Sequence, residues 1–293
     1  MKNSFPLLNS RRALAADRSF TALRNSGLAF AVAFTIFATG CSKEAATITP
    51  KKKLADVATL SEQIAARPVS LFGLGTAGNF AILSKAGVTA TAGSTVIGNV
   101  GVGPIASTAI TGFGLVSDPS SEFSTSAIVT KGRIFGPDYA APTPSIITKA
   151  VADMEAAFEL NSANGNSTRI PADLSGVTLF PGTYYIPAAY MSAGGTLTLD
   201  GLGDEGAQFI FQTESSLTLG ANTSIVCTDS ATPENILWVV GSAATFGTNV
   251  NFAGTILAKT AVTLNTDDII HGQIFAQTAV TMTGSHIESP VSW

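Results

Sequence analysis

The chain has 293 residues, enough for one or two domains with a substantial core, and carries a formal net charge of −4. Only 12% of the residues are charged, about half of the usual share. From residue 70 onward acidic residues outnumber basic ones by sixteen to six, which argues against a nucleic-acid partner because no basic surface is available to displace counterions from phosphates.

The N-terminal segment reads as an export signal. Four arginines precede an apolar run at residues 27–37, and three small or polar residues then lead to Cys41. The run is short for a membrane span, and its end resembles the lipobox of bacterial lipoproteins, which implies cleavage after residue 40 and diacylation of Cys41. We therefore expect an exported protein with a lipid anchor at Cys41, held at the outer membrane or cell surface or released outside the cell. The alternative is an ordinary signal peptide with a chance cysteine.

Residues 41–69 are expected to form a lipidated tether, and residues 70–293 one folded domain. Cys227 is the remaining cysteine of that domain, so an internal disulfide is excluded, and we interpret Cys227 as a small buried residue.

One helix is predicted at about residues 144–161, following a proline-rich stretch, with Ser145 as its cap and Asn164-Gly165 at its end. Apolar residues recur there at helical spacing. They are Ile147, Ala150, Val151, Met154, Ala157, Phe158 and Leu160.

The rest of the domain is repetitive. Residues 236–245, 254–263 and 272–281 align without gaps: each has an apolar strand, a corner and a second strand of alternating character, and a short third stretch such as residues 250–252 returns the chain. This pattern predicts a three-sided β-solenoid, in which each coil buries its inward side chains against its neighbours. Because the first strand is apolar at consecutive positions, such as Trp238-Val239-Val240, it needs cover on both faces. We place the helix there, along the Trp238 side.

The second strands leave a different side open. Neighbouring side chains of a strand point to opposite faces, so inward Val262 and Leu264 put Thr263 outward. Stacked coils then form a flat ladder of hydroxyls and methyls with almost no charge. The candidate surface residues are Thr108, Thr111, Thr196, Thr198, Ser216, Thr218, Ser242, Ala243, Thr245, Thr260, Ala261, Thr263, Thr278, Ala279 and Thr281. Whether the rungs at Ala86–Thr89 and Gly195 belong to it stays open, and threonine can also occupy these positions merely for its β-propensity.

Several phrases in order resemble the DUF3494 family of ice-binding proteins, from about Leu74 to Ile287. They are residues 74–83, 108–113, 180–185, 196–200, 209–212 and 254–258. The resemblance implies a mostly β fold: a discontinuous right-handed β-solenoid with one long α-helix alongside and an early coil packed out of sequence order at one end. It also implies a Thr-Ala/Gly-x-Thr/Asn face that adsorbs to ice crystals and inhibits ice growth and recrystallisation. Such adsorption requires no catalysis, and we expect no cofactor or metal. We expect a monomer whose partners are ice and, through Cys41, a membrane.

Two other functions occur on comparable folds. A solenoid glycosidase or lyase needs paired carboxylates in a groove, whereas the acids at Asp204-Glu205, Asp229, Glu234 and Asp267-Asp268 are expected at solvated turns. His271 is expected at a corner without metal-ligand spacing. A surface adhesin or carbohydrate-binding module would favour exposed aromatics, and the cluster of Tyr184, Tyr185 and Tyr190 is expected to pack under a solenoid end instead.

Overall fold

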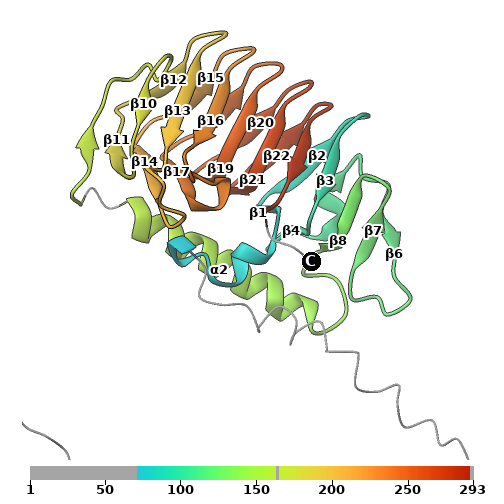
Figure 1. Cartoon of the computed structure of the whole chain (residues 1–293). Coiled ribbons are helices and arrows are strands. Elements are labelled where there is room, and N and C mark those ends of the chain that lie inside the picture. The colour runs from blue at the N-terminus through green and yellow to red at the C-terminus, as the bar shows by residue number, and fades with distance from the viewer. Residues whose placement is uncertain (1–70, 163–164, 291–293) are drawn as a thin grey trace, which may run out of the picture. The chain divides into compact units, whose positions relative to one another are not determined.

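The computed structural model describes residues 71–162 and 165–290. Within these residues the fold is mostly β, with parallel strands stacked coil upon coil and one long helix, α2 (Thr143–Ser162), lying lengthwise along the stack (Figure 1). The predicted signal peptide, Cys41 and the tether lie outside the described residues.

The smaller sheet is entirely parallel and consists of the short alternating strands of successive coils. Its order is β12 (Ala189–Met191), β15 (Leu217–Leu219), β18 (Ala244–Phe246), β20 (Val262–Leu264), β22 (Ala279–Met282), β2 (Gly87–Ala90) and β5 (Ile110–Thr111).

The larger sheet has a part that α2 covers. Its strands there are β9 (Thr168–Arg169), β11 (Gly182–Tyr185), β14 (Phe209–Thr213), β17 (Ile236–Val240), the second halves of β19 (Asn251–Ala258) and β21 (Ile269–Ala276), β1 (Ile82–Ser84), β4 (Val100–Val102) and the second half of β8 (Val129–Phe135). All five residues of β17 are buried, as expected for a strand enclosed on both faces.

The other part of the larger sheet lies away from α2. It contains β10 (Thr178–Leu179), β13 (Thr196–Asp200), β16 (Ser224–Thr228), the first halves of β19 and β21, β23 (His286–Glu288), β3 (Thr95–Ile97) and the first half of β8. Next to β8, the strands β7 (Ser124–Ser126) and β6 (Val116–Ser117) extend the sheet antiparallel. Short 3-10 turns complete the chain: η1 (Leu71–Gly73), η2 (Gly75–Asn79), η3 (Ser107–Ala109) and η4 (Pro233–Asn235).

Glycines allow β19 and β21 to pass from one part of the larger sheet to the other. Gly254 has φ +117°, and a Cβ added there would lie 2.7 Å from Ile236 Cγ2. At the matching position of the next coil, a Cβ on Gly272 would lie 1.8 Å from the Gly254 carbonyl oxygen. A side chain at either corner would therefore push adjacent coils apart, which explains the repeated glycine.

Two cores hold these layers together. Between the sheets, Phe211 and Trp238 stack with ring centroids 4.0 Å apart, and the Trp238 indole N–H donates to the Ala253 carbonyl at 3.1 Å. Between the larger sheet and α2, Leu237 and Phe275 pack in a second core of buried apolar residues. The predicted placement of the helix is confirmed, although Trp238 itself points into the inner core and its neighbours Leu237 and Val239 face the helix.

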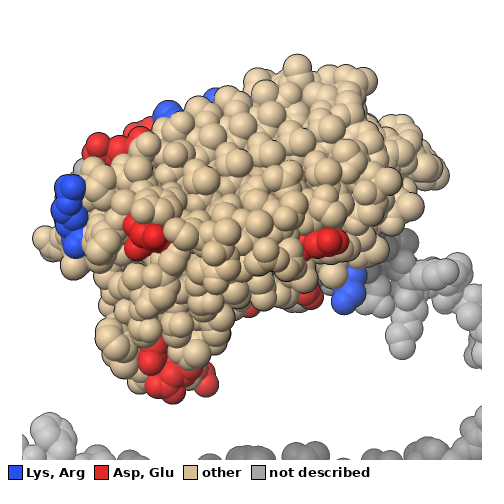
Figure 2. All heavy atoms as spheres, turned by 90° about the horizontal axis from the view of Figure 1, so that it is seen from above, with Lys and Arg blue, Asp and Glu red and all other residues tan. Residues whose placement is uncertain are grey.

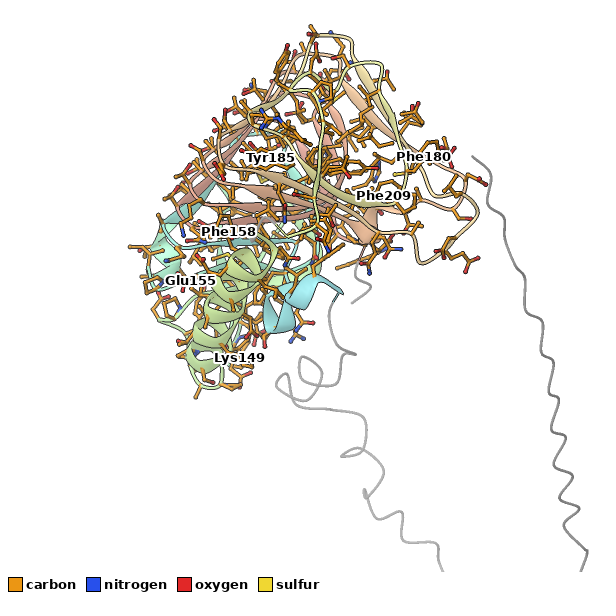
Figure 3. All side chains as sticks on the ribbon, turned by 90° about the vertical axis from the view of Figure 1, so that its left-hand side faces the viewer. Lys149, Glu155, Phe158, Phe180, Tyr185 and Phe209 are labelled. Carbon is orange, nitrogen blue, oxygen red and sulfur yellow. The ribbon has the colours of Figure 1, made fainter. Side chains whose placement is uncertain are left out.

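The helix matches its predicted range within one residue at each end. It begins at Thr143, so Ser145 lies in the first turn, where its hydroxyl donates to the Pro142 carbonyl. Viewed from the end, Phe158 lies on the sheet side of α2 and Lys149 on its outer side (Figure 3). Leu160 was wrongly assigned to the apolar face: it is 66% exposed, and Ile146 is buried instead.

The order of coils is discontinuous, as the family resemblance implied. β1 pairs with β21 on one side and β4 on the other, and β2 pairs with β22 and β5. The N-terminal coil thus stacks upon the last coil of the chain (Figure 1).

Candidate functional site

The smaller sheet carries six outward threonines in one continuous row. Strand pairing aligns each residue with the next across the sheet. The threonine row consists of Thr218, Thr245, Thr263, Thr281, Thr89 and Thr111. At one end the Thr89 and Thr111 hydroxyls lie 2.9 Å apart, within hydrogen-bonding distance.

The row is fixed from beneath. On either side of the first five threonines the strand turns an apolar residue inward, and Leu217, Leu219, Val262 and Leu264 are 2% exposed or less. Thr111, at the end of the row, has the buried Ile110 before it. Because interiors are close-packed, the strands have little freedom to shift. Threonine is also stiff at χ1, so its methyl and hydroxyl keep a defined position.

Two further rows of small side chains border the threonine row. The small-residue row lies two positions before each threonine and contains Ser216, Ala243, Ala261, Ala279, Gly87 and Ala109. The corner row lies one position earlier still and contains Ser215, Ser242, Thr260, Thr278, Ala86 and Thr108. Backbone bonds run along the corner row, for example Thr260 N–H to the Ser242 carbonyl at 3.2 Å.

None of the residues in the three rows is charged. The two lysines next to the corner row contact side chains of α2. Lys85 forms an ion pair with Glu155. Lys259 Nζ lies 3.4 Å from a Glu159 carboxylate oxygen and over the Phe158 ring. Seen from above, most of the surface is uncharged, and Lys, Arg, Asp and Glu atoms form separate spots, most of them toward its margins (Figure 2). The three rows themselves therefore offer methyls and hydroxyls rather than ions.

The structure separates two of the predicted site residues from the others. Thr196 and Thr198 lie on β13 of the larger sheet, where they pair with Ser224 and Val226 of β16. They do not join the three rows, because β13 follows the corner after β12 rather than stacking upon β15. The remaining thirteen candidate surface residues lie in the three rows.

Two residues in register with the threonine row, Thr89 and Tyr190, are not among the candidate surface residues predicted from the sequence. Thr89, whose rung was left open, sits in the threonine row between Thr281 and Thr111. Tyr190 lies in register beside Thr218 at the other end and is 42% exposed. The three tyrosines do not form one cluster, because Tyr184 and Tyr185 belong to β11 of the larger sheet, where Tyr184 stacks on Phe211.

One turn acid differs from its predicted environment. Asp268 is fully buried, and its carboxylate accepts backbone N–H bonds from Val250 at 2.9 Å and Asn265 at 2.7 Å. Burial, aided by the neighbouring charge of Asp267, raises the pKa of the Asp268 carboxyl to about 6. The carboxylate fastens the corner between consecutive coils, so the prediction of a solvated turn charge was wrong here.

The described side chains that could bind a metal ion or take part in catalysis do not gather in one place. Among the described residues no three His, Cys, Asp or Glu side chains lie close enough together to hold a metal ion. His271 lies within β21, with Nδ1 3.7 Å from a Glu288 carboxylate oxygen. Cys227 is half-buried, and burial raises the pKa of its thiol to about 11, which disfavours the reactive thiolate. Within the described part of the chain, no helix is both long and apolar enough to cross a membrane.

The amino-acid sequence is similar to those of known ice-binding proteins. A family described as ice-binding-like matches residues 82–288. An ice-binding protein of Typhula ishikariensis, K3-B1, is 37% identical over 214 residues, covering 72% of this chain and 86% of its own. The ice-binding protein of Leucosporidium sp. (strain AY30) is 40% identical over 198 residues, covering 66% of this chain and 74% of its own.

Solved structures agree with this result. A solved structure described as the structural basis for the antifreeze activity of an ice-binding protein from an Arctic yeast matches with a TM-score of 0.71 at 35% identity, covering 77% of this chain and 96% of that one. The DUF3494 domain of ice-binding protein 1 from Shewanella frigidimarina matches with a TM-score of 0.68 at 29% identity, covering 74% and 96%.

Proposed function

The chain belongs to the ice-binding-like family, and on that premise we propose that it adsorbs to ice through the threonine row and the two rows beside it. The observation that carries the proposal is the alignment of six threonines across six stacked strands with no charged residue among them. Bound protein pins the advancing crystal surface, so that ice between adsorbed molecules must curve. Curvature lowers the local freezing point and slows both growth and recrystallisation.

The geometry suits an ordered water layer. Strands in a sheet repeat at about 4.8 Å and alternate residues along a strand at about 6.7 Å, both close to oxygen repeats in ice. Methyls hold neighbouring waters in a cage, and hydroxyls anchor that cage by hydrogen bonds. A fixed row has little side-chain entropy to lose on binding, whereas Lys or Glu would bring mobile chains and organise water around a charge.

The proposal also covers the winding of the solenoid, the monomeric state and the place of the protein in the cell. We infer that residues 70–293 form one domain whose coils wind as a right-handed, three-sided solenoid, with the smaller sheet and the two parts of the larger sheet as its sides. The domain acts as a monomer and without catalysis. A lipid on Cys41 holds it at the outer membrane or cell surface, facing outward.

Ice adsorption is tested by growing an ice hemisphere in fluorescently labelled protein comprising residues 70–293. We expect label in the ice, in a pattern that reveals the planes bound. Thr218→Tyr, Thr245→Tyr and Thr263→Tyr each place a ring in the row and are expected to weaken the signal, while circular dichroism stays unchanged. Complete exclusion of wild-type label from ice contradicts the function. Normal binding by all three variants contradicts the location of the surface.

The lipid anchor is tested separately in the full chain. Cys41→Ala removes the thiol that would carry the lipid, so we expect the protein to move from the membrane fraction to the soluble fraction of the producing cells. Metabolic labelling with a fatty acid should mark the wild type and not the variant. Membrane association of Cys41→Ala equal to that of the wild type contradicts the anchor.

A further inference from the structure

The smaller sheet is longer than the threonine row. β12 pairs with β15 in register, Tyr190 opposite Thr218, and beyond β12 a single bridge pairs Asp173 with Tyr190. The backbone thus continues the row for two more positions, but an aromatic ring and a carboxylate stand where the next threonines would be.

The change lies in the side chains and not in the backbone. Tyr190 N–H donates to the Ala172 carbonyl at 3.0 Å, and the Leu174 N–H donates to the Tyr190 carbonyl at 3.0 Å. The flanking Ala189 and Met191 are each 2% exposed, so β12 is anchored in the core like the strands that bear threonine. The bordering positions also depart: Pro187 and Ala188 replace the Ser215 and Ser216 of the next coil.

Asp173 is held as an ion. Its carboxylate accepts the Ser175 backbone N–H at 2.9 Å and the Ser192 hydroxyl at 3.1 Å. Hydrogen bonds from Ser175, side chain and backbone, hold the pKa of this carboxyl below its usual value. A hydrated carboxylate orders water around its own charge, which conflicts with the water lattice that the threonines favour.

We propose that Tyr190, backed by Asp173, forms a boundary that ends the ice-facing surface at β15 and limits the row to six rungs; this inference rests on the proposed function. The Tyr190 ring stands taller than a threonine methyl and holds a crystal plane away from β12. Ice contact then runs from Thr218 to Thr111, about 24 Å if neighbouring strands repeat at about 4.8 Å. Tyr190 is a specificity-determining residue in this sense: it sets the extent of the surface.

The test adds the missing rung. Tyr190→Thr provides a seventh threonine in register, and we expect the lowest concentration that inhibits ice recrystallisation to fall by about two- to tenfold, the ratio that one net hydrogen bond provides. Tyr190→Val serves as a second variant, because it keeps a β-branched shape without the hydroxyl, and a smaller gain is expected. Tyr185→Thr, the same replacement on β11 of the larger sheet (Figure 3), is the matched control and should change nothing.

A bulky replacement gives the converse measurement. Tyr190→Trp should keep wild-type activity, because the position lies outside the contact, while Thr218→Trp one strand away should lose most of it. Loss of activity in Tyr190→Trp, or no gain in either Tyr190→Thr or Tyr190→Val while Thr245→Tyr is impaired, overturns the boundary and leaves the function standing. If Thr245→Tyr is also fully active, the location of the surface itself fails.

Discussion

The phrase Leu-Thr-Leu occurs on β13 and on β15, yet the two strands lie on different sides of the molecule. Thr218 of β15 continues into Thr245 and Thr263, whereas Thr198 of β13 lies between Thr178 and the exposed Val226. The row of Thr196, two positions earlier on β13, continues in register through Ser224, Asn251, Ile269 and His286 to Thr95. Threonine content is therefore similar at the start of both sides, and what distinguishes them is continuity from coil to coil.

Of the changes considered, placing a charge on each side in turn should give the largest difference in activity between the two sides. Thr245→Lys puts an ammonium in the middle of the threonine row, where contact with ice would require it to lose hydration at a cost of several kcal/mol. We expect recrystallisation inhibition to weaken by about a hundredfold, since 1.4 kcal/mol corresponds to a factor of about ten. Thr198→Lys is the matched control and should retain activity. Equal losses would mean that both sides contact ice.

Asp268 joins the two sides at a corner, and its ionisation should make stability depend on pH. Its folded pKa, raised to about 6, lies above the unfolded value of 3.8, so folding favours the protonated form. The destabilisation is fully present above pH 6 and is relieved as pH falls toward 4, by roughly 3 kcal/mol in the free energy of unfolding.

Denaturant unfolding at pH 5 and pH 8 measures this effect. The wild type should be more stable at pH 5, and Asp268→Asn should lose most of the difference because it has no titrating carboxyl at the corner. The other shifted aspartates, Asp118, Asp153 and Asp173, have lowered pKa values and contribute only below that range. A wild type equally stable at both pH values contradicts the assignment.

The smallest change is removal of one hydroxyl. Thr263→Val keeps the methyl groups and the β-branched shape, so the loss of ice affinity should be about two- to tenfold, as for one net hydrogen bond. Thr196→Val on β13 should have no effect. A full loss in Thr263→Val would show that the hydroxyl, and not the combination with the methyl, determines adsorption.

Much of the fold follows from periodicity. Alternation assigned the inward and outward residues of β15, β18, β20 and β22, and consecutive apolar residues in β17 required a covering helix, which α2 provides. The apolar spacing of α2 failed at Leu160, which is exposed, although the next residue, Asn161, still accepts a hydrogen bond from the Gln212 side chain of β14.

What alternation could not supply is the side of the solenoid to which a strand belongs. Thr196 and Thr198 alternate as Thr218 does, and only the position of each corner along the chain separates β13 from β15. The expectation that Tyr190 packs under a solenoid end was wrong, since it is exposed beside Thr218; its strand is only three residues long and follows a proline, so it shows no clear alternation. The burial of Asp268 depends on backbone N–H groups of two coils, and no local pattern announces such an arrangement.

The out-of-order coil has a consequence for folding during synthesis. The Ser84 hydroxyl donates to the Thr278 carbonyl across 194 residues, and Thr89 takes its place beside Thr281 through the same junction. Contacts of such high order form late, because the chain must first close a long loop. During synthesis, β1 and β2 each keep one strand edge without its hydrogen-bonding partner until β21 and β22 emerge from the ribosome. The threonine row is therefore completed only after β21 and β22 have been synthesised. A chain cut short before β21 lacks the partner strands through which Thr89 and Thr111 join the row.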